Sequence, residues 1–219
     1  MTNSCRIITY RGVAIRHFGQ VDYEPCLDAM REFTAAREDD TEDEIWIVEH
    51  PPVYTLGLAG KREHLLRETT IPVIKTDRGG QITYHGPGQL ILYPLVNLRR
   101  RKINVRQMVR MIEQSVVHWL ASLGVVAYGS SERPGVYVTI ADTETKMASL
   151  GLKIKNGCSY HGVSVNLTVS LDPFLNINPC GYPGMPMTRL KDLIADDLLP
   201  SFDEAGEALA KHLIDLITI

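Results

Sequence analysis

The 219-residue chain lacks several features that would assign it to a broad class of proteins. It has no apolar run of about 18 residues, which a membrane-spanning helix needs. Its first residues, 1–6, lack the basic-then-apolar pattern of a secretory signal. A net charge of −3 provides no global basic field for nucleic acid. We therefore expect a soluble cytoplasmic protein that binds neither membrane nor nucleic acid.

Short paired cysteine spacings and phosphate-binding motifs are also absent. The cysteines show no C-x-x-C pair, so neither a zinc knuckle nor a disulfide framework is indicated for Cys5, Cys26, Cys158 and Cys180. The histidines show no pairing at metal-ligand spacing, and no G-x-x-x-x-G-K-[ST] segment occurs. We expect reduced thiols, no metal site and no Walker-type phosphate cradle.

The pattern of apolar residues predicts one α+β domain. There is no internal repeat, low-complexity segment or Pro/Ser-rich linker, so we expect a single domain over residues 1–219. Helical spacing occurs over 23–38, over 105–123 and after Ser201. Strand-like runs occupy 5–10, 13–16, 45–48, 71–75, 89–96, 125–128, 135–140, 147–155 and 163–169. This order predicts an α+β fold with a mixed, largely antiparallel sheet packed with helices.

Three local signals mark element boundaries. Asn104 with Gln107, and Ser201 with Glu204, have the spacing of a capping box at a helix start. Asn156-Gly157 is a two-residue hairpin signal. It predicts that the run ending at Lys155 turns back antiparallel into the next strand.

Residues 78–90, Arg-Gly-Gly-Gln-Ile-Thr-Tyr-His-Gly-Pro-Gly-Gln-Leu, place four glycines and a proline between two strand-like runs. An ordinary turn between strands needs about 2 to 5 residues. Glycine allows main chain to approach a ligand closely, and the segment also carries polar and aromatic side chains. We interpret it as a wall of a binding site; an irregular hairpin is the alternative.

Two residues have the chemistry of a nucleophile and its activator. Cys180 lies in a loop, 178–184, whose prolines and glycines suit a packing cysteine poorly. Its thiol needs activation, because an unperturbed pKa of about 8.5 leaves little thiolate at neutral pH. Lys146 opens a run of small and apolar residues, where desolvation would lower its pKa and suit it to base work. A surface lysine is the alternative.

Other polar groups are candidates for supporting roles. His85 and His161 each precede a glycine, and either is a possible partner for the thiol, although a lone histidine is more often structural. Residues 99–102, with Arg106 and Arg110 at helical spacing, form a basic cluster on an otherwise acidic chain. This cluster is either a solvated face or a docking surface for an acidic partner.

Four segments resemble, in order, the signature blocks of the octanoyl-[acyl-carrier-protein]:protein octanoyltransferases, the enzymes that begin lipoate assembly. They are residues 78–89, Lys146-Met-Ala-Ser-Leu-Gly151, His161-Gly-Val-Ser-Val-Asn166 and Asn178-Pro-Cys-Gly181. The resemblance runs from about residue 43 to 195 and implies a fold similar to the catalytic domains of biotin and lipoate protein ligases. Those ligases also carry an Arg-Gly-Gly segment and a lysine, whereas the cysteine separates the transferases from them.

The resemblance implies roles for individual residues. Cys180 would be the nucleophile and Lys146 the group that lowers its pKa. The acyl-binding residues would be Arg78, Gly79, Gly80, Gln81, Ile82, Thr83, Tyr84, His85, Ser149, Leu150, Gly151, Gly162, Val163 and Ser164. Because one thioester replaces another, the reaction needs no ATP, and we expect no cofactor.

The resemblance also implies partners. Octanoyl-acyl carrier protein would be the donor, docking on the basic cluster. Lipoyl domains of 2-oxoacid dehydrogenase complexes and the glycine cleavage H protein would be acceptors. Two alternatives stay open: an ATP-dependent lipoate or biotin ligase of the same fold, and a non-catalytic acyl- or lipoyl-domain-binding protein in which Cys180 is incidental.

Overall fold

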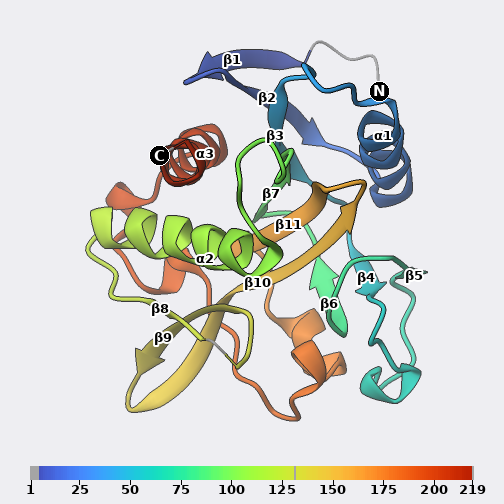
Figure 1. Ribbon diagram of the computed structural model, residues 1–219. Helices are drawn as coiled ribbons and strands as arrows, with labels where there is room; N and C mark the ends of the chain where they lie inside the picture. Colours follow the sequence, from blue (N-terminus) through green and yellow to red (C-terminus); the bar gives the residue numbers. More distant parts are fainter. Residues whose placement is uncertain (1–4, 131, 219) are drawn as a thin grey trace.

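The computed structural model describes residues 5–130 and 132–218, apart from the side chain of Cys180. Its main feature is an eight-stranded sheet in the order β1-β2-β3-β7-β11-β10-β9-β8 (Figure 1). The strands in that order are Arg6–Tyr10, Val13–Gln20, Asp43–Glu49, Gln89–Leu95, Cys158–Asn166, Thr143–Lys155, Gly135–Ile140 and Tyr128–Gly129. Only β2 and β3 pair in parallel within it.

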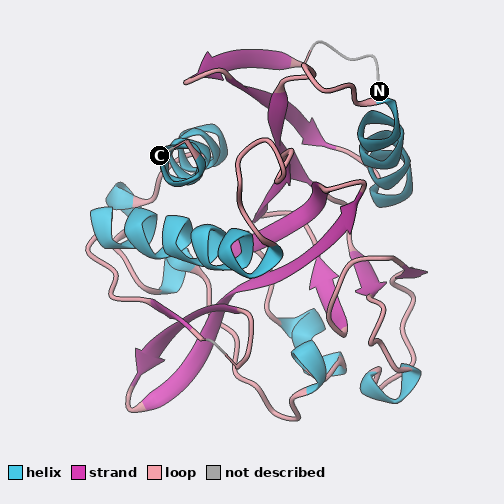
Figure 2. Cartoon of the chain, in the orientation of Figure 1, coloured by secondary structure: helices cyan, strands magenta, loops and turns pink. Residues whose placement is uncertain are grey.

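A second sheet has three strands in the order β5-β4-β6. These are Val73–Lys75, Val53–Leu56 and Ile82–His85, with β4 and β5 parallel and β4 and β6 antiparallel. The helices are α1 (Tyr23–Ala36), α2 (Val105–Ser122) and α3 (Phe202–Ile217), shown in cyan in Figure 2. The architecture is therefore α+β with a mixed, mostly antiparallel main sheet, as the sequence predicted.

The two faces of the main sheet are covered differently because strand side chains alternate. Leu90 and Leu92 of β7 point to a core that includes α2 and α3, which pack against each other. Ile91 and Tyr93 of the same strand point to the opposite face, where α1 contributes Tyr23, Cys26, Leu27 and Met30. The small sheet contributes a third apolar cluster of its own. The candidate site lies on the α1 side.

The predicted helix starts are confirmed, whereas α1 ends at Ala36 rather than at residue 38 and α2 ends at Ser122 rather than at residue 123. Asn104 and Gln107 form a reciprocal capping box at the start of α2, and Ser201 and Glu204 form another before α3. These contacts satisfy backbone N–H groups that a helix start leaves without partners. The hairpin predicted at Asn156-Gly157 joins β10 to β11. No helix in the described ranges is long and apolar enough to cross a membrane.

Several predicted strands differ in extent. Residues 125–127 are not a strand, because Val125 N–H turns back to the Leu120 carbonyl at the end of α2. β11 ends at Asn166 rather than Val169, since the N–H groups of residues 167–169 converge on the Gly88 carbonyl. The sequence reading missed β4 and β6, which are four residues each and lie beside proline-rich or glycine-rich segments.

A buried carboxylate joins the start of β3 to two arginine-bearing segments. Asp43 is fully buried, and its Oδ1 accepts from Arg37 Nη2 at 2.6 Å and from Arg100 Nη2 at 2.7 Å. Its Oδ2 accepts from Arg101 Nε at 2.8 Å. Arg100 and Arg101, which the sequence reading placed in a docking cluster, therefore bind an internal carboxylate. We therefore restrict the docking hypothesis to Arg106 and Arg110, which are exposed on α2.

Replacing Asp43 by Asn should lower the free energy of unfolding by about 3 kcal/mol, because it leaves guanidinium groups beside a neutral side chain. Urea unfolding measures this loss. Asp40→Asn, at an exposed position of the preceding turn, is the matched control and should change stability by less than about 0.5 kcal/mol. Equal effects of the two substitutions would contradict the structural role of Asp43.

Candidate functional site

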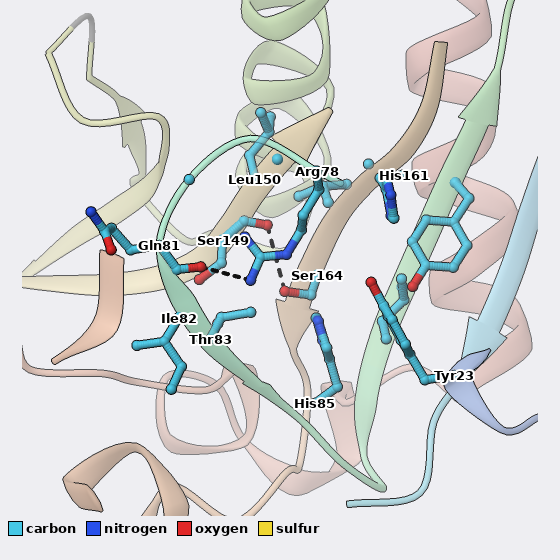
Figure 3. A pocket seen from close by; sticks show the side chains of 16 residues that line it. Tyr23, Arg78, Gln81, Ile82, Thr83, His85, Ser149, Leu150, His161 and Ser164 are labelled. Carbon is cyan, nitrogen blue, oxygen red and sulfur yellow. Dashed lines mark hydrogen bonds between the residues drawn. The ribbon is translucent and has the colours of Figure 1, made fainter. Parts of the chain in front are cut away.

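A cavity lies between the α1 face of the main sheet and the small sheet (Figure 3). Its lining comes from α1, β6, β7, β10, β11 and the glycine-rich segment. The expected acyl-binding residues that line it are Arg78, Gly80, Gln81, Ile82, Thr83, His85, Ser149, Leu150, Gly151, Gly162, Val163 and Ser164. The fold thus brings three sequence blocks, far apart in the chain, around one space.

Two of the expected lining residues lie elsewhere. Tyr84 packs into the small-sheet cluster, with its ring centroid 5.5 Å from those of Tyr54 and Phe174. Gly79 donates its N–H to the Leu152 carbonyl at 2.9 Å and lines a neighbouring cavity. The cavity also has four lining residues outside the expected set: Tyr23, Ile91, Tyr93 and His161.

Close backbone approach explains two of the glycines. A Cβ on Gly151 would lie 2.7 Å from the Gly79 carbonyl oxygen, and one on Gly162 would collide with the Leu92 carbonyl. Any other residue at either position would push the glycine-rich segment or β7 away from the hairpin. These positions let the strands close around the cavity.

The buried guanidinium of Arg78 ties the glycine-rich segment to β4. Its Nη2 donates to the Thr55 carbonyl at 2.6 Å and to the Gln81 carbonyl at 2.9 Å, and Nη1 donates to the Gly79 carbonyl at 2.9 Å. The planar fork of donors suits arginine and no other residue. Arg78 therefore lines the cavity and also fixes the shape of its wall.

Buried imidazoles form the inner side of the cavity, where Figure 3 shows Tyr23, His85 and His161 together. Burial, with a smaller effect of His50, lowers the pKa of His85 to about 3. His85 Nδ1 donates to Gln89 Oε1 at 2.7 Å, so its Nε2 accepts from the Thr55 hydroxyl at 3.3 Å. His85 is thus neutral at pH 7 and holds the wall.

His50 and His161 complete this polar layer. Burial lowers the pKa of His50 to about 4; its Nδ1 donates to the Val21 carbonyl and its Nε2 accepts from the Tyr93 hydroxyl at 2.8 Å. His161 Nε2 lies 2.8 Å from Asp77 Oδ1, and the hydrogen bond from His161 depresses the pKa of Asp77. The sequence left His85 and His161 as possible thiol partners; here both are committed to buried hydrogen bonds.

A second cavity of about 310 Å³ adjoins the first, and the two share Gly80, Gln81, Leu150 and Gly151 as common wall. It is also lined by Lys146, by the 132–134 segment, by Tyr182 and by Val105 and Val109 of α2. Lys146 is 1% exposed, so the buried alternative for this lysine is confirmed over the surface one. It lies within β10, three residues after the strand begins, rather than at its opening.

The ammonium group of Lys146 has defined neighbours. Nζ donates to the Pro134 carbonyl at 3.2 Å and to the Tyr137 hydroxyl at 3.3 Å. The pairing of β10 with β9 shifts between Lys146 and Ala148, a β-bulge that redirects the side chains around it. The backbone of Lys146 pairs with residues 186–188 through Pro186 O and Thr188 N.

Cys180 lies in a short 3₁₀ turn, Pro179–Gly181, and its side chain is outside the described part of the structure. The turn contacts β6. A Cβ on Gly181 would lie 3.2 Å from Gln81 Cγ, on the wall shared by the two cavities. Tyr182, two residues on, lines the same cavity as Lys146. Of the other cysteines, Cys26 and Cys158 are buried and Cys5 is half-buried; all three are free thiols.

A chain of hydrogen-bonded side chains links the glycine-rich segment to residues 186–188, which follow the Pro179–Gly181 turn. Gln89 accepts from His85 and donates through Nε2 to Asn166 Oδ1 at 2.9 Å. Asn166 Nδ2 in turn donates to the Thr188 carbonyl at 2.9 Å, and Thr188 N–H donates to the Lys146 carbonyl. The sequence predicts no separate role for Asn166, which is the last residue of the motif 161–166. An asparagine that follows a run of small and apolar residues in a strand is a signal for a positioning role, because a buried amide needs hydrogen-bond partners.

Within the described ranges, no group of three or more His, Cys, Asp or Glu side chains could hold a metal ion. The site is instead built from a buried lysine, a buried arginine and neutral imidazoles around an apolar lining. The first cavity has a volume of about 40 Å³ and includes Ile82, Leu150 and Val163 in its lining, and the lysine beside the shared wall is a group that can carry out proton transfer.

Comparisons with known proteins are consistent with this geometry. The model of the lipoyl protein ligase A/B catalytic domain family matches residues 22–214. A curated relative from Dechloromonas aromatica (strain RCB), named octanoyltransferase, is 54% identical over 200 residues, 91% of this chain and 94% of the relative. Another octanoyltransferase, from Laribacter hongkongensis (strain HLHK9), is 57% identical over 199 residues, 91% of this chain and 93% of the relative.

Solved structures share the fold at low sequence identity. A bi-partite lipoate protein ligase from Thermoplasma acidophilum superposes with a TM-score of 0.72 at 14% identity, covering 94% of this chain and 83% of that chain. A biotin protein ligase from Aquifex aeolicus, in complex with biotin and ATP, gives a TM-score of 0.55 at 10% identity, covering 93% and 70%. The predicted similarity in fold to lipoate and biotin ligases is confirmed.

The neutral histidines predict how stability depends on pH. Each folded-state pKa lies below the unfolded value of about 6.5, so the unfolded chain binds more protons between those values. The stabilisation is complete above about pH 6.5 and is lost as the pH falls toward 4, by up to about 1.4 kcal/mol per pH unit for each histidine.

A His50→Gln/His85→Gln variant should therefore show a shallower decline in unfolding free energy between pH 6.5 and 4, measured by urea unfolding. His118→Gln, at an exposed position of α2, should keep the wild-type slope. A double variant with the wild-type slope would show that these imidazoles do not stay neutral.

Proposed function

Because this chain belongs to the lipoyl protein ligase A/B catalytic domain family, and within it to the octanoyltransferases, we propose that it carries the octanoyl group as a thioester on Cys180. The chain is an acyltransferase that transfers octanoyl groups in protein lipoylation, from an acyl donor to lipoyl-domain acceptors. The proposal concerns the identity of the donor, the covalent intermediate and the residues that act on it.

The observation that carries the proposal is the buried lysine beside the wall shared by two cavities. Lys146 is almost fully buried, and its cavity shares Gly80, Gln81, Leu150 and Gly151 with the apolar one. An acyl chain in the first cavity would have its carbonyl end near this wall. The backbone of the Cys180 turn adjoins the same wall at Gln81, which supports a thioester at this point.

The acyl chain would be held by apolar contact. Ile82, Leu150 and Val163 line the first cavity. Each buried CH₂ contributes about 0.8 kcal/mol, so an eight-carbon chain supplies several kcal/mol of binding energy. The neutral state of His85 suits this role, because an imidazolium on the inner wall would oppose burial of a hydrocarbon tail.

The chemistry proceeds in two acyl transfers. In the first, the free amine of Lys146 takes the proton of the Cys180 thiol, and the thiolate attacks the thioester of octanoyl-acyl carrier protein. The new S–C bond forms as the pantetheine thiolate leaves, and the Lys146 ammonium group gives the proton to it. In the second, a lysine amine of the acceptor attacks the acyl-enzyme and gives an amide; Lys146 accepts the proton of that amine and passes it to the leaving Cys180 thiolate, which returns the thiol. No ATP enters either step.

The acceptors we propose are lipoyl domains of 2-oxoacid dehydrogenase complexes and the glycine cleavage H protein. Their reacting lysine would reach the acyl-enzyme through the second cavity, which has a larger volume than the first and is lined by Val105 and Val109 of α2. The amide product is more stable than the thioester, so transfer runs toward the acceptor.

Mixing the protein with octanoyl-acyl carrier protein without ATP should add one octanoyl group, seen by intact mass spectrometry. Cys180→Ala should abolish the adduct, whereas Cys5→Ala, at a half-buried thiol remote in sequence, should retain it. Lys146→Met fills the buried site without an amine and should slow acylation by about 100-fold or more.

An adduct that survives Cys180→Ala would show that the nucleophile is another residue. Acylation that requires ATP and free octanoate would instead indicate a ligase. Binding of the carrier without any adduct would indicate a non-catalytic binding protein.

Donor docking is proposed at the start of α2. Arg106 and Arg110 are exposed and one turn apart, and Val105 and Val109 of the same helix segment line the second cavity. Acyl carrier proteins are acidic as a class, so opposite charge at the cavity mouth would favour their encounter.

Arg106→Glu/Arg110→Glu should therefore raise KM for the acyl carrier by about tenfold at low salt and leave kcat nearly unchanged, with the difference fading as salt screens the charges. Lys75→Glu/Lys191→Glu makes the same change in net charge at exposed positions outside α2 and should leave KM unchanged. Steady-state kinetics at two ionic strengths measures both. An unaltered KM in the α2 variant at low salt would remove this docking surface.

A further inference from the structure

A buried carboxylate on α2 has no part in the two acyl transfers described above. Glu113 is 7% exposed, on a helix whose other buried residues are, Ser115 aside, apolar. Leaving a carboxylate inside a protein costs free energy unless it is hydrogen-bonded. Its contacts therefore indicate what it holds in place.

Glu113 binds the backbone at the start of β9. Its Oε1 accepts a hydrogen bond from Gly135 N–H at 2.9 Å. The carboxylate also packs against Gly129, where a Cβ would lie 3.1 Å from Oε2. The side chain thus fills the space between the two ends of the loop that leads into β9.

The Pro134–Gly135 peptide group, whose N–H binds Glu113, contacts Lys146 through its carbonyl. The Gly135 N–H and the Pro134 carbonyl belong to one peptide unit, and that carbonyl accepts from Lys146 Nζ at 3.2 Å. A trans peptide is planar, with its N–H and C=O pointing in opposite directions. Fixing the N–H on Glu113 therefore fixes the direction of the carbonyl toward the ammonium group.

Local backbone geometry makes this orientation specific. Gly135 has φ of +145°, and a Cβ there would lie 2.7 Å from both the Ala148 carbonyl oxygen and Lys146 Cε. Only glycine brings the peptide this close to the lysine. A hydrogen bond from the N–H to a carboxylate also polarises the peptide, which makes its carbonyl oxygen a stronger acceptor.

We propose that Glu113 is a positioning residue that holds the Lys146 ammonium group at the shared wall through the Pro134–Gly135 peptide. The inference rests on the proposed function, in which Lys146 acts on Cys180. It adds a charged residue of α2 to the surroundings of Lys146, to whose cavity α2 otherwise contributes Val105 and Val109.

The charged and titratable groups around this pair come from several elements. Lys146 faces Tyr137 on β9 and shares its cavity with Glu132, Arg133 and Tyr182. Burial raises the pKa of Glu113, whereas the Gly135 N–H and the charges of Lys146 and Arg110 act in the opposite direction. The charge of Lys146 therefore favours the ionised form of Glu113.

The test measures the rate at which iodoacetamide alkylates Cys180 as a function of pH, because only the thiolate reacts. Glu113→Met fills the volume without an acceptor and should slow alkylation at pH 7 by about three- to tenfold, with an apparent thiol pKa shifted upward. Glu113→Gln keeps a carbonyl oxygen for the Gly135 N–H and should stay within about twofold of wild type. Peptide mass spectrometry assigns the alkylated cysteine.

Controls separate positioning from general damage. Ser115→Ala removes a buried hydroxyl on the same helix that donates to the Ile112 carbonyl at 2.7 Å, and it should not change the alkylation profile. Melting temperature verifies that each variant folds. In turnover, Glu113→Met should lower kcat with KM for the carrier retained.

Unchanged alkylation in a folded Glu113→Met, or an equal loss in Glu113→Gln, would overturn the positioning role. If Lys146→Met also leaves the thiol profile unchanged, the proposed function fails as well. If Lys146→Met slows alkylation and Glu113→Met does not, only the present inference fails.

Discussion

The position of the wall between the two cavities depends on one buried group, the guanidinium of Arg78. The Arg78 guanidinium binds carbonyl groups of the glycine-rich segment and of β4, and so holds a segment with little regular structure in a defined position. A lysine could not satisfy these acceptors in one plane. Without these hydrogen bonds, the wall between the two cavities would have no fixed position. Neither an acyl chain nor the reacting groups would then be held in a defined place.

The two cavities on either side of this wall differ in character. The inner cavity is apolar, with neutral imidazoles behind it, and the outer cavity carries the lysine and opens beside α2. Solved structures with the same fold include a biotin protein ligase in complex with biotin and ATP. In the present chain, we propose that Cys180 and the buried Lys146 act at the wall between the two cavities.

Helices and long strands could be predicted from the sequence because their signals are local. The capping boxes at Asn104 and Ser201 and the Asn156-Gly157 turn act within a few residues, and the structure contains each of them. The short β4 and β6 could not, since they form by pairing with each other and, for β4, also with β5. The side of β6 on which Tyr84 lies could not be predicted either, because it depends on the pairing register of the strand, which no local sequence pattern specifies.

The candidate site was predictable where residues fall in compact motifs and not where tertiary packing supplies them. Tyr23 comes from α1, and Glu113 lies on a helix whose apolar face explains the helix without it. Arg100 and Arg101 looked like free surface charge because the buried Asp43 is more than fifty residues away in sequence. Long-range polar contacts of this kind leave no periodic signal.

The central claim is that the acyl chain is attached to Cys180 and buried in the inner cavity. A crystal structure of the protein after reaction with an octanoyl thioester tests it most directly. The account predicts continuous density from the Cys180 sulfur into the space between Ile82, Leu150 and Val163. An octanoyl group on a different residue, or a chain lying in the apolar groove of Leu66, Phe174 and Leu175, would contradict it.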